Sequence, residues 1–140
     1  MLFGTQEVIA RDLSEGQYFV NSGGLTTAVF ADDCRFKDPT TDVAGLARYM
    51  AALDILFDPA SSRVVLLECR ATGPRQVTAR WTLQGYLKFP WHPYVPPFEG
   101  SSVYTLNEQG LIAEQKETWA INAWDALVET LTPTAGPPAA

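Results

Sequence analysis

The hydrophobic pattern of this chain changes its period once, near Ser62, and this change restricts the fold more than any other feature. Apolar residues between 43 and 57 recur at spacings of three and four, which is typical of a helix. After Ser62 the alternation has a period of two, which is typical of strands. Four strands are predicted, at 63–72, 76–88, 100–107 and 111–121. Helices followed by a run of antiparallel strands indicate the α+β class.

Further helices are predicted near both ends of the chain. Thr5 is the expected N-cap of the first helix, and Asn122 is the expected N-cap of the last. Thr41 is the expected N-cap of the helix in the middle of the chain. A helical turn is expected at 25–30 and a short strand at 34–38.

The predicted strand at 76–88 is unusually long, about 43 Å at roughly 3.3 Å per residue. Gly85 interrupts its pattern and is the natural place for a bulge, so we expect a strongly curved strand. A long bent sheet wrapped around helices makes a cone, and the inside of a cone is a natural pocket.

The segment between the second and third of these strands has the most unusual composition. Residues 89–98 hold four prolines, four aromatic residues and the only histidine of the chain. Because proline fixes φ and has no amide hydrogen, the segment is predicted to be a stiff loop that stays outside the sheet. Such a loop could form a rim or lid over the cone or an aromatic contact for a partner. The rim or lid residues are Trp91, His92, Tyr94 and Phe98.

Composition and charge indicate a single globular domain over 1–132, followed by a disordered tail or linker at 133–140. The net charge is −6, and the ten basic residues are scattered, so nucleic-acid binding is not expected. No apolar run is long enough to span a bilayer, and the first residues lack the features of a signal peptide. A soluble intracellular protein is therefore expected.

The chain offers little material for metal or cofactor chemistry. It has one histidine and two cysteines without a CxxC pair, so a structural zinc site is not expected. Any histidine-based proton transfer or haem ligation would have to use His92. We therefore expect no cofactor.

Several short stretches, taken in order, resemble one superfamily. They are Phe30–Asp33, Phe36–Pro39, Arg80–Thr82 with Gly85, Pro90–Trp91, Phe98–Ser101 with Tyr104, and Gly110–Ile112 with Glu114 and Lys116. This set resembles the nuclear transport factor 2-like superfamily, including its SnoaL-like and ketosteroid-isomerase-like members. Within the superfamily it most resembles an uncharacterised plant and cyanobacterial domain family.

The resemblance implies a cone-shaped α+β barrel with N-terminal helices packed on a strongly curved antiparallel sheet. It also implies a homodimer formed through the sheet and a location in the chloroplast stroma or the cyanobacterial cytoplasm. It implies no particular activity, because this fold carries enzymes, binding modules and assembly domains alike.

Asp38 is the predicted catalytic residue. A carboxylate at the mouth of an apolar cone could have its pKa raised by desolvation and act as a general base. Ketosteroid-isomerase-like enzymes place a base in this region and an oxyanion-donating tyrosine on the first helix, and Tyr18 is the nearest match to that tyrosine. The alternative is that Asp38, which precedes Pro39, braces a turn through local hydrogen bonds.

The remaining predicted site residues are walls of a ligand pocket. They are Phe36, Leu53, Trp81, Tyr104 and Trp119, with Arg80 as an anchor for an anionic ligand. The alternative for the apolar residues is core packing, and the alternative for Arg80 is a cross-strand ion pair with a glutamate.

Three functional hypotheses follow from the sequence. The favoured one is a module, more plausibly non-enzymatic, that binds a small apolar ligand or a protein partner. The second is a cofactor-independent isomerase, dehydratase or cyclase that uses Asp38 as base and Tyr18 as oxyanion donor. The third is a homodimerisation module of a larger protein.

Overall fold

The computed structural model describes residues 2–120 together with 125, 133, 134 and 137. In the first half of the chain the elements are α1 (Leu2–Ser14), the 3₁₀ turns Ser22–Gly24 and Thr27–Val29, β1 (Phe30–Lys37), β2 (Asp42–Ala44) and α2 (Leu46–Asp54). In the second half they are β3 (Arg63–Gly73), β4 (Gln76–Tyr86), β5 (Tyr94–Leu106) and β6 (Ile112–Trp119).

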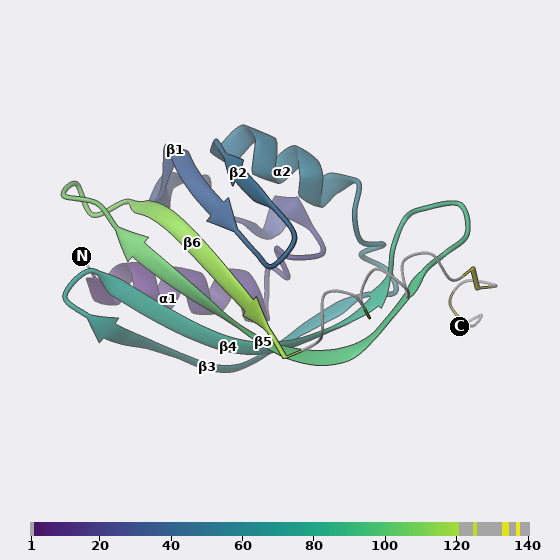
Figure 1. Ribbon diagram of the computed structural model, residues 1–140. Coiled ribbons are helices and arrows are strands. Elements are labelled where there is room, and N and C mark those ends of the chain that lie inside the picture. The colour runs from purple at the N-terminus through teal and green to yellow at the C-terminus, as the bar shows by residue number, and fades with distance from the viewer. Residues whose placement is uncertain (1, 121–124, 126–132, 135–136, 138–140) are drawn as a thin grey trace.

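The strands form one sheet in the order β2-β1-β6-β5-β4-β3 (Figure 1). Neighbouring strands are antiparallel except β1 and β6, which run parallel, so the sheet is mixed and not wholly antiparallel as predicted. The sheet is strongly bent and does not close. α1 packs against β3 and β4, and α2 packs against β1 and β2. The result is the expected α+β cone, open at one end.

The pairing of β4 with β5 has a bulge at Gly85, as predicted. The pairing of β4 with β5 shifts register between Leu83 and Gly85, and Gly85 has a φ of +155°. A Cβ atom there would lie 2.1 Å from the Ser62 hydroxyl oxygen. Only glycine fits such a close approach, so the bulge requires glycine at this position.

The prediction that residues 89–98 stay outside the sheet is wrong for their second half. β5 begins at Tyr94, which pairs with Tyr86, and Phe98 pairs with Leu83. Pro96 and Pro97 lie where the register of the two strands shifts. At such a bulge a missing amide hydrogen removes no regular ladder bond, so the prolines are tolerated within a strand.

The middle helix also differs from the prediction. Residues 42–44 pair with β1 as a short edge strand, and α2 therefore begins at Leu46 instead of directly after Thr41. A bidentate ion pair between Arg35 and Asp42, with N–O distances of 2.8 and 2.6 Å, accompanies this pairing. The first helix begins at Leu2, so Thr5 lies within it and is buried.

Two sequence predictions concern residues beyond these elements. The helix expected after Asn122 lies outside the described residues, as does most of the tail at 133–140. Thr134 is described, and its backbone N–H donates to the Trp91 carbonyl oxygen at 2.8 Å.

α1 ends in a turn that places the following tyrosine in the core. Gln17 has a φ of +57°, and its side-chain amide donates to the Leu13 carbonyl oxygen at 3.1 Å and the Val64 carbonyl oxygen at 2.8 Å. Its side-chain oxygen accepts from the Val64 amide at 2.7 Å. Gln17 therefore joins the end of α1 to the edge strand β3, and the chain then turns inward at Tyr18, which is 1% exposed.

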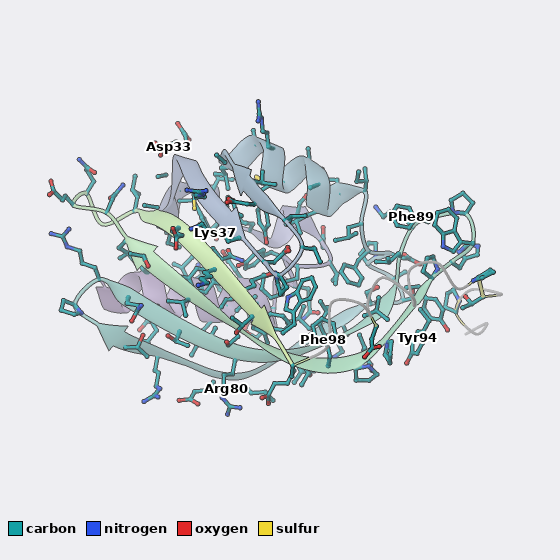
Figure 2. All side chains as sticks on the ribbon, in the orientation of Figure 1. Asp33, Lys37, Arg80, Phe89, Tyr94 and Phe98 are labelled. Carbon is teal, nitrogen blue, oxygen red and sulfur yellow. The ribbon has the colours of Figure 1, made fainter. Side chains whose placement is uncertain are left out.

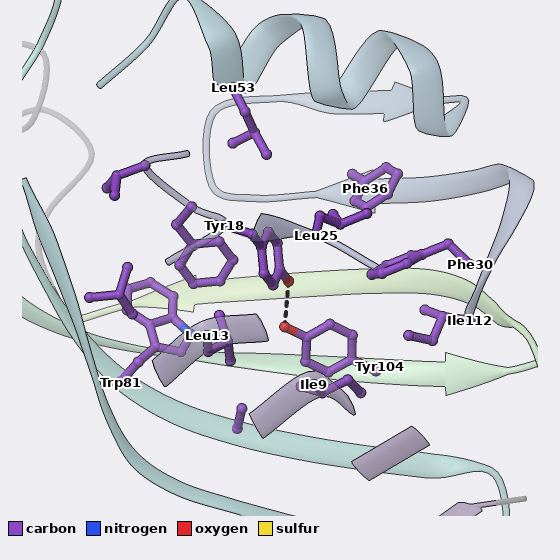
Figure 3. Close-up of a cluster of buried hydrophobic side chains, with 14 of the residues drawn as sticks. Ile9, Leu13, Tyr18, Leu25, Phe30, Phe36, Leu53, Trp81, Tyr104 and Ile112 are labelled. Carbon is purple, nitrogen blue, oxygen red and sulfur yellow. Dashed lines mark hydrogen bonds between the residues drawn. The ribbon is translucent and has the colours of Figure 1, made fainter. Parts of the chain in front are cut away.

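The core lies between the helices and the inner face of the sheet (Figure 3). Ile9 and Leu13 of α1 pack there with Phe30, Tyr104 and Ile112 from the sheet.

No helix in the described part of the chain has the length and apolar character needed to cross a membrane.

Candidate functional site

A cavity of about 520 Å³ lies between the inner face of the sheet and α2. This volume is in the range that holds small organic ligands in proteins. Most of the lining is apolar and aromatic. Its main walls are Phe19, Phe36, Leu53, Trp81, Phe98 and Trp119.

Trp81 is the more buried of the two tryptophans in the wall, and three features fix its ring. A Cβ atom on Gly100 would lie 2.5 Å from the Trp81 ring, so the glycine makes room for the indole against β5. The indole Nε1 donates to the Ser102 hydroxyl at 3.0 Å. The ring also meets Phe19 and Phe98 edge to face, with centroids 4.9 and 5.9 Å apart. These contacts hold the indole in one orientation, so the floor of the cavity is rigid.

The polar end of the cavity is formed by β6. Because side chains alternate along a strand, Gln115, Glu117 and Trp119 share the face turned into the cone. Glu117 accepts a hydrogen bond from Gln115 Nε2 at 3.1 Å and another from the Trp119 side chain. Burial, and next the negative charge of Asp38, raise the pKa of the Glu117 carboxyl to about 8.

A chain of hydrogen bonds runs from the core to Glu117. The Tyr18 hydroxyl donates to the Gln115 side-chain oxygen at 2.9 Å and lies 2.6 Å from the Tyr104 hydroxyl (Figure 3). Since the Tyr18 proton is directed at Gln115, Tyr104 donates to Tyr18. Burial raises the pKa of both tyrosines, so both hydroxyls stay protonated and orient the Gln115 amide toward Glu117.

Tyr49 of α2 completes this end of the cavity. Its ring stacks on Phe36, with centroids 3.7 Å apart and planes 2° apart. Its hydroxyl accepts a long hydrogen bond from Gln115 Nε2 at 3.4 Å. Burial, and next the Glu117 charge, raise the pKa of Tyr49, so it remains a neutral hydroxyl beside Glu117.

Asp38 follows β1 at the wall of the same cavity. Its Oδ1 accepts from the Thr40 amide at 2.8 Å, the Thr40 hydroxyl at 2.9 Å and the Thr41 amide at 2.8 Å. Its Oδ2 accepts from the Thr41 hydroxyl at 2.8 Å. These are the local contacts of a braced turn, and they hold the carboxylate in a polar setting, unlike that of Glu117.

The structure places some of the predicted site residues at the cavity and others away from it. Those that line the cavity are Phe36, Asp38, Leu53, Trp81, Phe98 and Trp119. Tyr18 and Tyr104 lie in the core beside the cavity, where their hydroxyls contact each other and Gln115. Tyr18 therefore reaches the cavity only through the Gln115 side chain.

Arg80 lies on the outer face of the sheet (Figure 2). It is next to the inward-facing Trp81, and the alternation of a strand turns it the other way. Its guanidinium donates to Glu68 at 3.3 Å and to Glu99 at 3.2 Å. It thus forms cross-strand ion pairs and does not line the cavity.

The predicted rim residue Tyr94 and the nearby Phe89 lie at the same end of the molecule (Figure 2). Phe89 lines the cavity and stacks on Trp91, with ring centroids 5.1 Å apart, and Trp91 is 38% exposed. Tyr94 packs against Tyr86 with centroids 5.1 Å apart. His92 is exposed and has a φ of +48°.

Sequence reasoning missed Glu117 and Tyr49 as site residues. In the sequence, Glu117 is one of several charged residues on a predicted strand. It shares a face of that strand with Gln115 and Trp119. A glutamate on the inward face of a strand is unusual, and this signal could have identified it. The surroundings of Tyr49 come from β1 and β6, so its own segment carries no such signal. The described residues hold no cluster of three or more metal-ligating side chains.

One protein family matches most of this chain. A family model described as an uncharacterized conserved protein (DUF2358) matches residues 6–115. None of the curated proteins matches the chain.

Solved structures share the fold at low sequence identity. A nuclear transport factor 2-like protein of unknown function from Cytophaga hutchinsonii aligns with a TM-score of 0.59 and 11% identity, over 88% of this chain and 94% of that one. SalBIII, an epoxide hydrolase/cyclase-like enzyme of pyran ring formation in salinomycin, aligns at 0.61 and 13%, over 83% and 90%. A SnoaL-like polyketide cyclase candidate from Mesorhizobium loti aligns at 0.62 and 17%, over 84% and 97%. The fold is therefore nuclear transport factor 2-like.

Proposed function

This chain belongs to the DUF2358 family, and we propose that it binds a small, mostly apolar molecule in the cavity of its cone. The observation that carries this proposal is the cavity itself, about 520 Å³ with rigid aromatic walls and one polar end. An empty cavity lowers the stability of a domain, and larger side chains would fill it if it had no use. A cavity that stays open between well-packed walls is therefore typical of a ligand site.

The polar end gives the ligand an orientation. Glu117 has a pKa of about 8, so at neutral pH its carboxyl is mostly protonated and can donate a hydrogen bond to a ligand oxygen. Gln115 and Trp119 hold this carboxyl in place. The expected ligand therefore has an apolar body that fits the aromatic walls and one polar group that reaches Glu117.

Filling the cavity is expected to abolish binding. Ala52 and Ala47 are both exposed alanines of α2, but only Ala52 lines the cavity. With the neutral fluorescent probe N-phenyl-1-naphthylamine, the wild type and Ala47→Trp should give the same dissociation constant. Ala52→Trp should weaken binding at least about tenfold, because its indole occupies the space of the probe. Equal affinity in all three proteins, or no binding by the wild type, would contradict the proposal.

An enzymatic role is the second candidate, and one observation favours it. Two carboxyls in different settings, Asp38 in a polar turn and Glu117 in an apolar wall, face one cavity, and such pairs often divide the roles of base and acid. Asp38 would remove a proton next to a ligand carbonyl. The Tyr18 hydroxyl would support the developing oxyanion through Gln115.

This candidate predicts proton exchange at carbon. The wild type should speed deuterium incorporation next to the carbonyl of 2-tetralone, followed by NMR. Asp38→Asn should lower the rate about 10²- to 10⁴-fold, which is the usual range for a lost general base. Asp42→Asn, an exposed aspartate outside the cavity, is the matched control. An unchanged rate in Asp38→Asn would exclude this residue as the base.

A further inference from the structure

Of the aspartate, glutamate and lysine side chains at the cavity, those that point into it are carboxyls. Asp38 and Glu117 both line it. Among the described lining residues, Lys37 alone has a cationic side chain, and its ammonium lies 3.7 Å from Glu114. Glu114 and Glu117 are three residues apart on β6 and therefore lie on opposite faces of the sheet. The Lys37 charge thus belongs to the outer face, and the cavity is left with two carboxyls.

Four side chains at this end already direct hydrogen-bond donors at these carboxyls, and the Tyr49 hydroxyl is a further donor beside them. Thr40 and Thr41 donate to Asp38, while Gln115 and Trp119 donate to Glu117. A bound carboxylic acid would face two carboxyls, and these four side chains could not donate to it because their donors are already engaged. A ligand that brings its own donors and a positive charge would complement the same atoms.

We propose that the ligand of this cavity is a hydrophobic primary amine, bound as its ammonium ion with the nitrogen against Glu117 and Asp38. This inference rests on the proposed function and names the chemical class of its ligand. The aromatic walls take the apolar body and can also attract the cation through their ring faces. Ionised Glu117 supplies the charge-assisted hydrogen bond that makes the pair strong in an apolar cavity.

Proton release is a signature of this binding mode. With a pKa of about 8, Glu117 is about nine-tenths protonated at pH 7 in the free protein. An arriving ammonium favours the ionised carboxylate, so close to one proton is released for each amine bound. A neutral ligand leaves the proton on Glu117.

The other groups that face Glu117 do not contribute to this proton release. Asp38 stands at the end of β1, and its charge acts to keep the Glu117 proton in the free protein. The tyrosines are Tyr49 from α2, Tyr104 from β5 and Tyr18 from the turn after α1, and burial raises the pKa of all three above the ordinary value of 10. They therefore remain protonated at pH 7, and Lys37 is directed to Glu114.

Three matched naphthalenes test the inference by isothermal titration calorimetry at pH 7. They are 2-(aminomethyl)naphthalene, 2-naphthalenemethanol and 2-naphthoic acid. We expect the amine to bind more tightly than the alcohol and at least about tenfold more tightly than the acid. Repeating the amine titration in phosphate and in Tris, whose ionisation enthalpies differ, should report release of nearly one proton.

Two variants assign the effect to its residue. Glu117→Gln should lose the preference for the amine and the proton release, while it keeps binding of the alcohol. Glu114→Gln removes the same charge from the outer face of the same strand and should keep both properties. If the alcohol binds and the amine binds no better, the amine class is wrong and the cavity remains a ligand site. If neither these ligands nor N-phenyl-1-naphthylamine binds, the proposed function fails together with this inference.

Discussion

Replacing Trp81 by alanine is expected to lower the free energy of unfolding by about 3–5 kcal/mol, the usual cost of removing a fully buried tryptophan. Trp81 is 1% exposed and forms the floor shared by the core and the cavity. The substitution removes its edge contacts with Phe19 and Phe98 and leaves the Ser102 hydroxyl without the indole donor. The space beside Gly100 would stay empty, because the bent backbone of β5 cannot collapse into it.

Urea denaturation of the variant measures this loss. Trp91→Ala is the matched control, because Trp91 is 38% exposed at the rim, and its removal should cost about 1 kcal/mol or less. A loss from Trp81→Ala as small as the control would mean that the indole contributes no core packing. The probe N-phenyl-1-naphthylamine should also bind differently to the Trp81→Ala protein, because the floor of its cavity is gone.

The strands of the second half of the chain were predictable because their signals are local. The alternation of apolar and polar residues along each strand can be recognised from the sequence of that strand alone. Gly85 indicates the bulge because glycine has no side chain. The entry of Pro96 and Pro97 into β5 was not predictable in the same way. Whether a proline fits in a strand depends on the register of the partner strand, which is a property of the assembled sheet.

The candidate site was predictable only in part, for a related reason. Resemblance and strand position lead to Asp38, and the inward face of β4 leads to Trp81. The character of Glu117 comes from burial beneath α2 and from the charge of Asp38, which is far away in the sequence. Tyr18 meets Gln115, 97 residues further along the chain, so the partner of its hydroxyl could not be read from its own segment. The dimer through the sheet and the plastid or cyanobacterial location stay predictions.

The raised pKa of Glu117 predicts that the domain loses stability as the pH rises through neutrality. An ordinary glutamate carboxyl titrates near 4.5, whereas this one titrates at about 8 in the folded protein. Between these values the folded state holds a proton that the unfolded state has released, so the free energy of unfolding falls with increasing pH. The slope approaches about 1.4 kcal/mol per pH unit, and the total is about 3–5 kcal/mol, lost by the time the pH passes 8.

Glu117→Gln should remove this decline, because an amide in the same place carries no charge at any of these pH values. Urea denaturation at pH 5, 6.5 and 8 should give the wild type a falling free energy of unfolding and the variant a much flatter one. Raised pKa values of about 12 for Cys34 and 11 for Cys69 act above this window, and the lowered pKa of Asp42 acts below it. Glu114→Gln, on the outer face of the same strand, should keep the wild-type slope. Parallel curves for the wild type and Glu117→Gln would show that Glu117 is ionised in the folded protein throughout, and the carboxyl would then be a fixed negative charge in the cavity.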